Sequence, residues 1–203
     1  MPASIRANQR GRTRRDLLEA ALRVSADDGA PTLEAIAEEA RVSRATAYRY
    51  FPNVDDLLAE AALHMAFPGA DCLSGASDDP LERLLLVDDA VDRMIAANET
   101  ALRRMIASTA KLPLQSTGVP ARQNRRLPLI EAALEPARSK FSASSYRQLT
   151  RALSLVIGTE AMLVLKDVLG LEDAEARDVR RRAIASLLEW ALRDAFDRTD
   201  RPG

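Results

Sequence analysis

One short stretch of the chain, residues 43–51, gathers the side chains best suited to binding a polyanion. It reads SRATAYRYF and holds two arginines, several hydroxyl groups and no acid, in a chain with only one Trp, three Tyr and four Phe. Arginine donates to guanine edges or phosphate oxygens, and hydroxyl groups suit phosphates and base edges. On charge alone, a solvated helix face is a commoner explanation of such a stretch than a binding surface. The helices and turns that position these groups decide between the two interpretations.

The surrounding sequence predicts two helices joined by a short turn. Thr32 offers a hydroxyl N-cap for a helix over 33–40, whose apolar residues recur at helical spacing. After residues 41–43, in which Ser43 is the next expected cap, a helix of barely two turns over 44–51 ends before a proline. Helix, three-residue turn and short second helix form the helix-turn-helix arrangement.

The short second helix has a predicted inner and outer face. Ala47 and Phe51 lie four residues apart and can face inward, while Val42 fills the turn. A helix about 10 Å across fits a DNA major groove about 12 Å wide. In proteins generally, a tyrosine is more often partly buried with its hydroxyl group in water. The spacing of the turn favours exposure of the tyrosines in this helix. The residues expected to contact double-stranded DNA are Thr32, Ser43, Arg44, Ala45, Thr46, Tyr48, Arg49 and Tyr50.

Two further helices are predicted to flank this pair. An apolar stripe predicts a helix over 12–28 that stops at Gly29, and Asn53 caps a helix that runs to about Met65. Five arginines and no acid lie within residues 1–15, although the whole chain has a formal charge of only −1. A basic tail of this kind can meet a polyanion locally, or can simply be solvated.

Over about residues 12–65 the sequence resembles the tetracycline-repressor-like (TetR) family of bacterial regulators. The resemblance rests on Ile36-Ala37, Ala40, Val42-Ser43, Thr46, Tyr48, Tyr50-Phe51 and Leu57-Leu58 at the family's spacing. It implies a homodimer that binds a palindromic operator, usually represses transcription, and releases DNA when a small-molecule effector enters a second domain. The helix over 53–65 is expected to transmit that change.

Two positions depart from the family pattern. Arg41 stands where the family usually has a turn glycine, and arginine tolerates a positive φ poorly. We therefore expect either an adjusted turn or local strain there. Val54 replaces a lysine that often contacts phosphate, so that contact is not carried over.

The rest of the chain predicts a second helical domain. Residues 67–80 are loop-like in composition, so we expect an all-α fold with a three-helix helix-turn-helix domain over 1–66 and a larger ligand-binding and dimerisation domain over 67–203. Its helices are expected at 80–97, 99–112, 127–140, 144–169 and 173–196, with a stretch broken by proline and glycine over 113–128. The last two helices carry broad apolar faces, for which a second copy of the chain is the expected cover.

Six residues are candidates for an effector pocket, with core or dimer packing as the alternative for each. Soft or aromatic side chains suit a cavity lining, and a carboxylate in an apolar helix needs a partner. Arg151, Arg104 or a cationic ligand could pair with the carboxylate. The candidates are Met94, Met105, Thr159, Glu160, Met162 and Trp190.

Composition argues against several other classes. The chain has 203 residues with one Cys and one His, so disulfide frameworks, histidine-rich metal sites and histidine-centred triads have almost no material. No phosphate-binding glycine loop, nucleophile with an evident base, or apolar run of about 18 residues occurs. We expect a cytoplasmic, non-enzymatic protein with no cofactor, metal or membrane partner. An all-helical adaptor that binds protein without binding DNA is the alternative.

Overall fold

The computed structural model describes residues 2–25, 31–110 and 124–199, and every regular element among them is helical. The predicted all-α fold is therefore confirmed. Contacts within the chain group it into two compact units, Met1–Phe67 with Asn98–Gln123, and Pro68–Ala97 with Asn124–Gly203.

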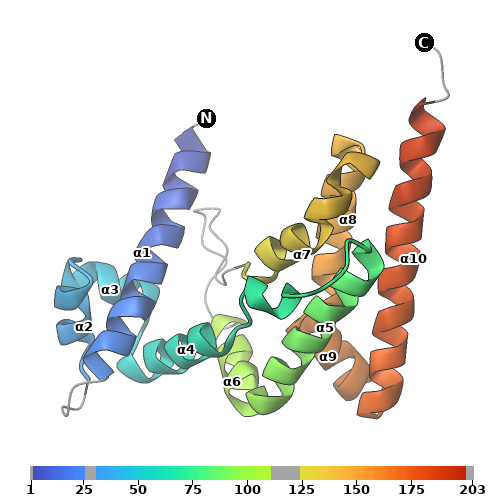
Figure 1. Ribbon diagram of the computed structural model, residues 1–203. Helices are drawn as coiled ribbons and strands as arrows, with labels where there is room; N and C mark the ends of the chain where they lie inside the picture. The colour runs from blue at the N-terminus through green and yellow to red at the C-terminus, as the bar shows by residue number, and fades with distance from the viewer. Residues whose placement is uncertain (1, 26–30, 111–123, 200–203) are drawn as a thin grey trace. The chain divides into compact units, whose positions relative to one another are not determined.

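The first unit contains five described helices (Figure 1). Their bounds are Pro2–Ser25 for α1, Leu33–Glu39 for α2, Arg44–Tyr50 for α3, Val54–Ala66 for α4 and Glu99–Ala110 for α6. α1 packs against α2 and α4, α2 packs against α3, and α4 packs against α6. The expected start of α1 at residue 12 is wrong, because the helix already begins at Pro2 and ends at Ser25.

Three polar N-caps set where these short helices begin. The backbone N–H of Ala35 donates to the Thr32 hydroxyl at 3.2 Å, and that of Thr46 donates to the Ser43 hydroxyl at 3.1 Å. The Asp56 N–H donates to the Asn53 side-chain oxygen at 2.8 Å. All three caps match the prediction, because Ser, Thr and Asn oxygens satisfy the first N–H groups of a helix.

The second unit is built on four longer helices with short helical turns between them. The helices are α5 (Pro80–Ala97), α7 (Arg126–Leu134), α8 (Ala143–Val156) and α10 (Asp173–Thr199). The short elements are η1 (Ala70–Leu73), η2 (Glu135–Lys140), α9 (Thr159–Met162) and the π-helical η3 (Leu163–Val168). α10 runs beside α8 and also packs against α5, while α7 lies against α5 and α8 (Figure 1).

The expected continuous helix over 144–169 is wrong, because the chain breaks at Ile157 and Gly158. Gly158 has φ 144°, a conformation that L side chains rarely adopt, and the helix axis bends by 47° there. The Arg126 guanidinium lies against Gly158 where a Cβ would be. Gly170, with φ 65°, ends the segment in the left-handed conformation that glycine adopts readily.

α6 groups with the first unit, although the sequence analysis assigns it to the second domain. The chain therefore passes between the units at Phe67, at Ala97 and again before Asn124. The expected division of function at residue 66 stays a prediction. Most of the expected broken stretch over 113–128 lies outside the described residues. None of the described helices alone is long and apolar enough to cross a membrane, though α8 with Thr159–Val168 passes that test as a bent pair.

Candidate nucleic-acid interface

The turn between α2 and α3 is closed by backbone hydrogen bonds and a left-handed residue. Arg41 has φ 55° and is the one non-glycine residue with positive φ in the described part of the chain. Its N–H donates to the Glu38 carbonyl and the Val42 N–H to the Ala37 carbonyl, both at 2.9 Å. The turn is therefore not adjusted to avoid a positive φ at this position. The arginine takes the left-handed conformation that glycine favours.

The inner face of α3 is anchored in the core of the first unit. Ala47 and Phe51 are buried, and Val42 is half-buried against the same cluster, as predicted. Leu17, Ile36 and Leu57 from α1, α2 and α4 belong to that cluster. Because three helices contribute to the anchor, α3 presents its outer side chains from a fixed base.

A buried cation lies directly behind α3. The Arg14 guanidinium lies 4.5 Å from the centre of the Phe51 ring and donates to Glu60, with 2.9 Å from Nε to Oε1. The two side chains are only 12% and 7% exposed. Arg14 therefore joins α1 to α4, whereas Arg12 and Arg15 are exposed. The other two arginines of the basic tail lie where side chains are not described.

The predicted DNA-contact residues lie together at the outer face of α3 and at the start of α2. Thr46 and Tyr50 are half-buried, and Tyr50 packs on the core cluster. Tyr48 is 43% exposed. The remaining predicted residues, Thr32, Ser43, Arg44, Ala45 and Arg49, are exposed. Thr32 and Ser43 also serve as N-caps, so their hydroxyl groups already have partners.

The two arginines on this face stack on tyrosines. The Arg44 guanidinium carbon lies 5.5 Å from the centre of the Tyr48 ring, and that of Arg49 lies 5.7 Å from the centre of the Tyr50 ring. Cation–π contacts of this kind limit where a long, flexible side chain points. The face thus offers two guanidinium groups with fixed neighbours rather than freely mobile charges.

Glu34, in the first turn of α2, was missed by the sequence analysis. Its Oε1 pairs with an Arg44 NH2 group at 2.9 Å and accepts a hydrogen bond from the Tyr48 hydroxyl at 3.1 Å. Backbone hydrogen bonding first, and then the Tyr48 hydroxyl and the Arg44 charge, hold the pKa of Glu34 below its ordinary value. Only the crossing of α2 and α3 brings this acid to α3, so spacing along the chain carried no signal for it.

This arrangement defines a class of protein. A capped helix, a three-residue turn and a short second helix with an exposed basic face are the parts of a helix-turn-helix DNA-binding domain.

Comparison with known proteins narrows the class. Residues 17–61 match the family described as bacterial regulatory proteins, tetR family. Over 88 residues the chain is 41% identical to the HTH-type transcriptional repressor LfrR of Mycolicibacterium smegmatis. The aligned residues make up 40% of this chain and 47% of that protein. The chain thus spans about half the length of that relative. The similarity to the tetR family thus rests on residues 17–61, which hold α2 and α3.

A solved structure gives a broader likeness. The crystal structure of a TetR transcriptional regulator from Rhodococcus sp. RHA1 superposes with a TM-score of 0.47 at 21% identity, over 88% of this chain and 97% of that one.

The residues expected to line an effector pocket are divided between the two units. Met94, Thr159 and Met162 are buried in the second unit, whereas Trp190 of α10 is 38% exposed. Met105 lies on α6, which groups with the first unit.

Glu160 has a partner that sequence reasoning did not consider. It pairs with Arg126 at 2.6 Å, which is neither of the two suggested partners, Arg151 and Arg104. The same guanidinium group donates to the Ser154 and Ile157 carbonyls, at 2.8 and 3.3 Å. Arg126 therefore satisfies carbonyls that the break after α8 leaves without helical partners.

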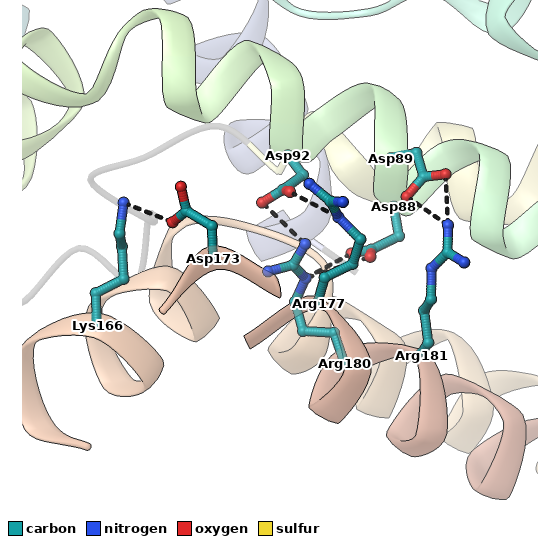
Figure 2. Close-up of polar contacts among 8 residues, drawn as sticks. All are labelled: Asp88, Asp89, Asp92, Lys166, Asp173, Arg177, Arg180 and Arg181. Carbon is teal, nitrogen blue, oxygen red and sulfur yellow. Dashed lines mark hydrogen bonds and ion pairs between the residues drawn. The ribbon is translucent and has the colours of Figure 1, made fainter. Parts of the chain in front are cut away.

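A second missed feature is the ion-pair network between α5 and α10 (Figure 2). Arg180 Nε lies 3.1 Å from Asp88 Oδ1, and an Arg180 NH2 group lies 2.9 Å from Asp92. Arg181 pairs with Asp89 at 2.9 Å. Asp88 is 2% exposed, so packing encloses one carboxylate of two that are adjacent in the sequence.

Burial controls the ionisation of this network. Desolvation raises the pKa of Asp88 to about 6, although Arg180 opposes that shift. Burial alone would lower the pKa of Arg180, but Asp88 and Asp92 together raise it. Both partners are therefore charged at neutral pH. No group of three or more His, Cys, Asp or Glu side chains in the described residues could hold a metal ion.

Proposed function

We propose that this protein is a transcriptional repressor that binds a palindromic operator as a homodimer and releases it when a small molecule binds the second unit. The observation that carries the proposal is the outer face of α3, where Arg44, Tyr48 and Arg49 are exposed above a buried anchor. The first residues of such a helix reach base edges in a major groove, and guanidinium groups there bond guanine or phosphate. The name of the relative LfrR, a transcriptional repressor, agrees with the proposed outcome of binding.

Exposed apolar side chains support the homodimer. Within the second unit they lie on α8, on η3, at the residue that follows η3, and on α10, where a partner molecule could cover them. A second copy would cover them, and its recognition helix would have to lie about 34 Å from the first to use successive major grooves. These side chains are Leu155, Val164, Val168, Leu169, Val179 and Trp190.

Release by an effector requires the two recognition helices to change their separation. α4 is the proposed transmitter, because it packs on α1 behind the anchor of α3 and the chain leaves the first unit at its end. The proposed lining of the ligand site in the second unit is Met94, Thr159 and Met162, which are buried there. A ligand must bind the two states with affinities several kcal/mol apart to shift such an equilibrium fully.

DNA binding is tested with the purified full-length protein and duplexes from the region upstream of its own gene. The proposal predicts one preferred duplex whose affinity falls steeply with salt, because bound phosphates recapture counterions on release. Arg44→Ala should cost about 1–3 kcal/mol on the preferred duplex and change base preference, while Tyr50→Phe should weaken all duplexes about equally. Arg104→Ala, which removes the same charge from α6, is the matched control.

Two results would overturn the proposal. Binding without salt dependence, or equal binding of every sequence by wild type and Arg44→Ala, would favour the adaptor alternative. A particle that remains monomeric by light scattering at micromolar concentration, with and without the preferred duplex, would overturn the homodimer.

A further inference from the structure

Glu34 is an acid placed among the groups proposed to contact DNA. One oxygen, Oε1, receives both an Arg44 NH2 group at 2.9 Å and the Tyr48 hydroxyl at 3.1 Å. Arg44 also lies over the Tyr48 ring, so the three side chains form a closed triangle that joins α2 to α3. All three side chains belong to the described residues.

The triangle fixes the direction of Arg44 without hiding it. A guanidinium group has five N–H donors in a rigid plane, and the carboxylate engages one of its two NH2 groups. The Arg44 side chain is still 69% exposed, so the remaining donors face solvent. A guanidinium group that is already oriented loses less conformational freedom on forming a bidentate contact than a mobile one. This exposure argues against an acid that blocks the arginine.

The charge of Glu34 has a second effect. An acid near the approaching duplex repels phosphates whatever their sequence, so it weakens binding to all DNA. The carboxylate would thus lower affinity for unspecific DNA while improving the geometry of one base contact. The repulsion is common to all duplexes and leaves the ratio of specific to unspecific affinity unchanged. The improved base contact raises that ratio, which is what an operator-binding protein requires.

We propose that Glu34 is a positioning residue that sets sequence selectivity by holding Arg44 and Tyr48 in their reading geometry. The inference rests on the proposed DNA-binding function and adds a role for an acid on α2. Its ligand is the same duplex DNA, and Glu34 acts on it through Arg44.

The test separates charge from geometry with three variants. Glu34→Gln removes the charge, Glu34→Asp keeps the charge but withdraws the carboxylate by one methylene, and Glu38→Gln removes an equal charge from another exposed position of α2. Each is titrated against two fluorescent duplexes of equal length and composition. One is selected from a random-sequence library by the wild-type protein, and the other is its shuffled counterpart.

Glu34→Gln is expected to bind the shuffled duplex about twofold to tenfold more tightly and to lose at least about fivefold in selectivity, the lower end of one bidentate contact. Glu34→Asp should lose selectivity without gaining affinity for the shuffled duplex. Glu38→Gln should keep the wild-type ratio. On an Arg44→Ala background, Glu34→Gln should cause no further loss of selectivity, since the coupled partner is absent.

The outcomes separate this inference from the proposed function. An unchanged or increased selectivity in Glu34→Gln, or a full loss that persists on the Arg44→Ala background, overturns the positioning role alone. A wild-type protein that selects no duplex from the library overturns the proposed function and this inference with it. Thermal melting identifies a variant that is misfolded, in which case the two other substitutions decide.

Discussion

The two units use the same chemical pair, arginine with a carboxylate, in opposite environments. In the first unit, Arg44 and Glu34 are 69% and 43% exposed. In the second, Arg180 and Asp88 are 7% and 2% exposed. An exposed pair contributes little to stability and is screened by salt, whereas breaking a buried pair leaves a charge without compensation.

This difference separates two uses of arginine. On α3 the pair is open to solvent, so Arg44 keeps donors free for bases or phosphates. Between α5 and α10 the partners are held by burial, so Arg180 and Asp88 fasten two helices together (Figure 2). Arg14 with Glu60 shows that the first unit also uses the buried form, but behind α3 rather than on its outer face.

The largest expected effect is on the buried pair. Arg180→Ala should lower the free energy of unfolding by about 3–5 kcal/mol at pH 7, because buried Asp88 then has no partner at Arg180's position and must either stay charged without compensation or take up a proton. Arg181→Ala, one residue along α10, removes the partner of Asp89. This pair is more exposed than Arg180 with Asp88, so its loss should cost less than about 1 kcal/mol. Urea unfolding of both variants measures the contrast, and equal losses would contradict it.

The pH dependence of stability should report Asp88 directly. The pKa of Asp88 is about 6 in the folded chain against an ordinary value of 3.8. Between these values the folded state holds the extra proton on Asp88, so the contribution of Asp88 to stability falls as the pH rises from about 4 to about 6 and is constant above that range. At 1.36 kcal/mol per pH unit, the loss is about 3 kcal/mol.

The Asp88→Asn variant isolates this contribution. All other carboxyl groups are common to the two proteins, so the stability of the variant relative to wild type should rise by about 3 kcal/mol between pH 4 and pH 7. Unfolding in urea at a series of pH values measures the difference. A difference that does not change with pH would mean that Asp88 titrates normally in the fold.

A smaller effect is expected at the break after α8. Arg126→Ala removes the donor to the Ser154 and Ile157 carbonyls and should cost about 1–3 kcal/mol. Glu160→Gln is the matched variant, since it keeps an acceptor and changes a residue whose side chain is 43% exposed, and it should cost less. Equal costs would mean that Arg126 stabilises the break through its ion pair with Glu160 rather than through its hydrogen bonds to the carbonyls.

Local signals predicted the first unit better than the second. Thr32, Ser43 and Asn53 each cap a helix within three residues, so the sequence specifies those starts by itself. The inward positions of Ala47 and Phe51 follow from helical spacing in the same way. The break at Gly158 was missed because its apolar neighbours continue the pattern of a buried helix.

The missed site residues depend on contacts between distant elements. Asp88 and Arg180 are 92 residues apart, and Arg126 and Glu160 are 34 apart, so nothing in either neighbourhood indicates a partner. Glu34 and Arg44 are closer, but their contact depends on how α2 crosses α3. Charged residues look solvated in a sequence until packing shows which of them are enclosed.

The smallest expected effect on stability is the sharpest test of the comparison. Arg44→Ala should leave the urea midpoint of the free protein unchanged, because its pair with Glu34 is solvated and its side chain packs on no buried group. The same variant should lose affinity for the preferred duplex, whereas Arg180→Ala should lose stability. A drop in the urea midpoint for Arg44→Ala would mean that the Glu34 triangle supports the fold. The exposed arginine would then be structural like the buried one, and the division between the two uses would fail.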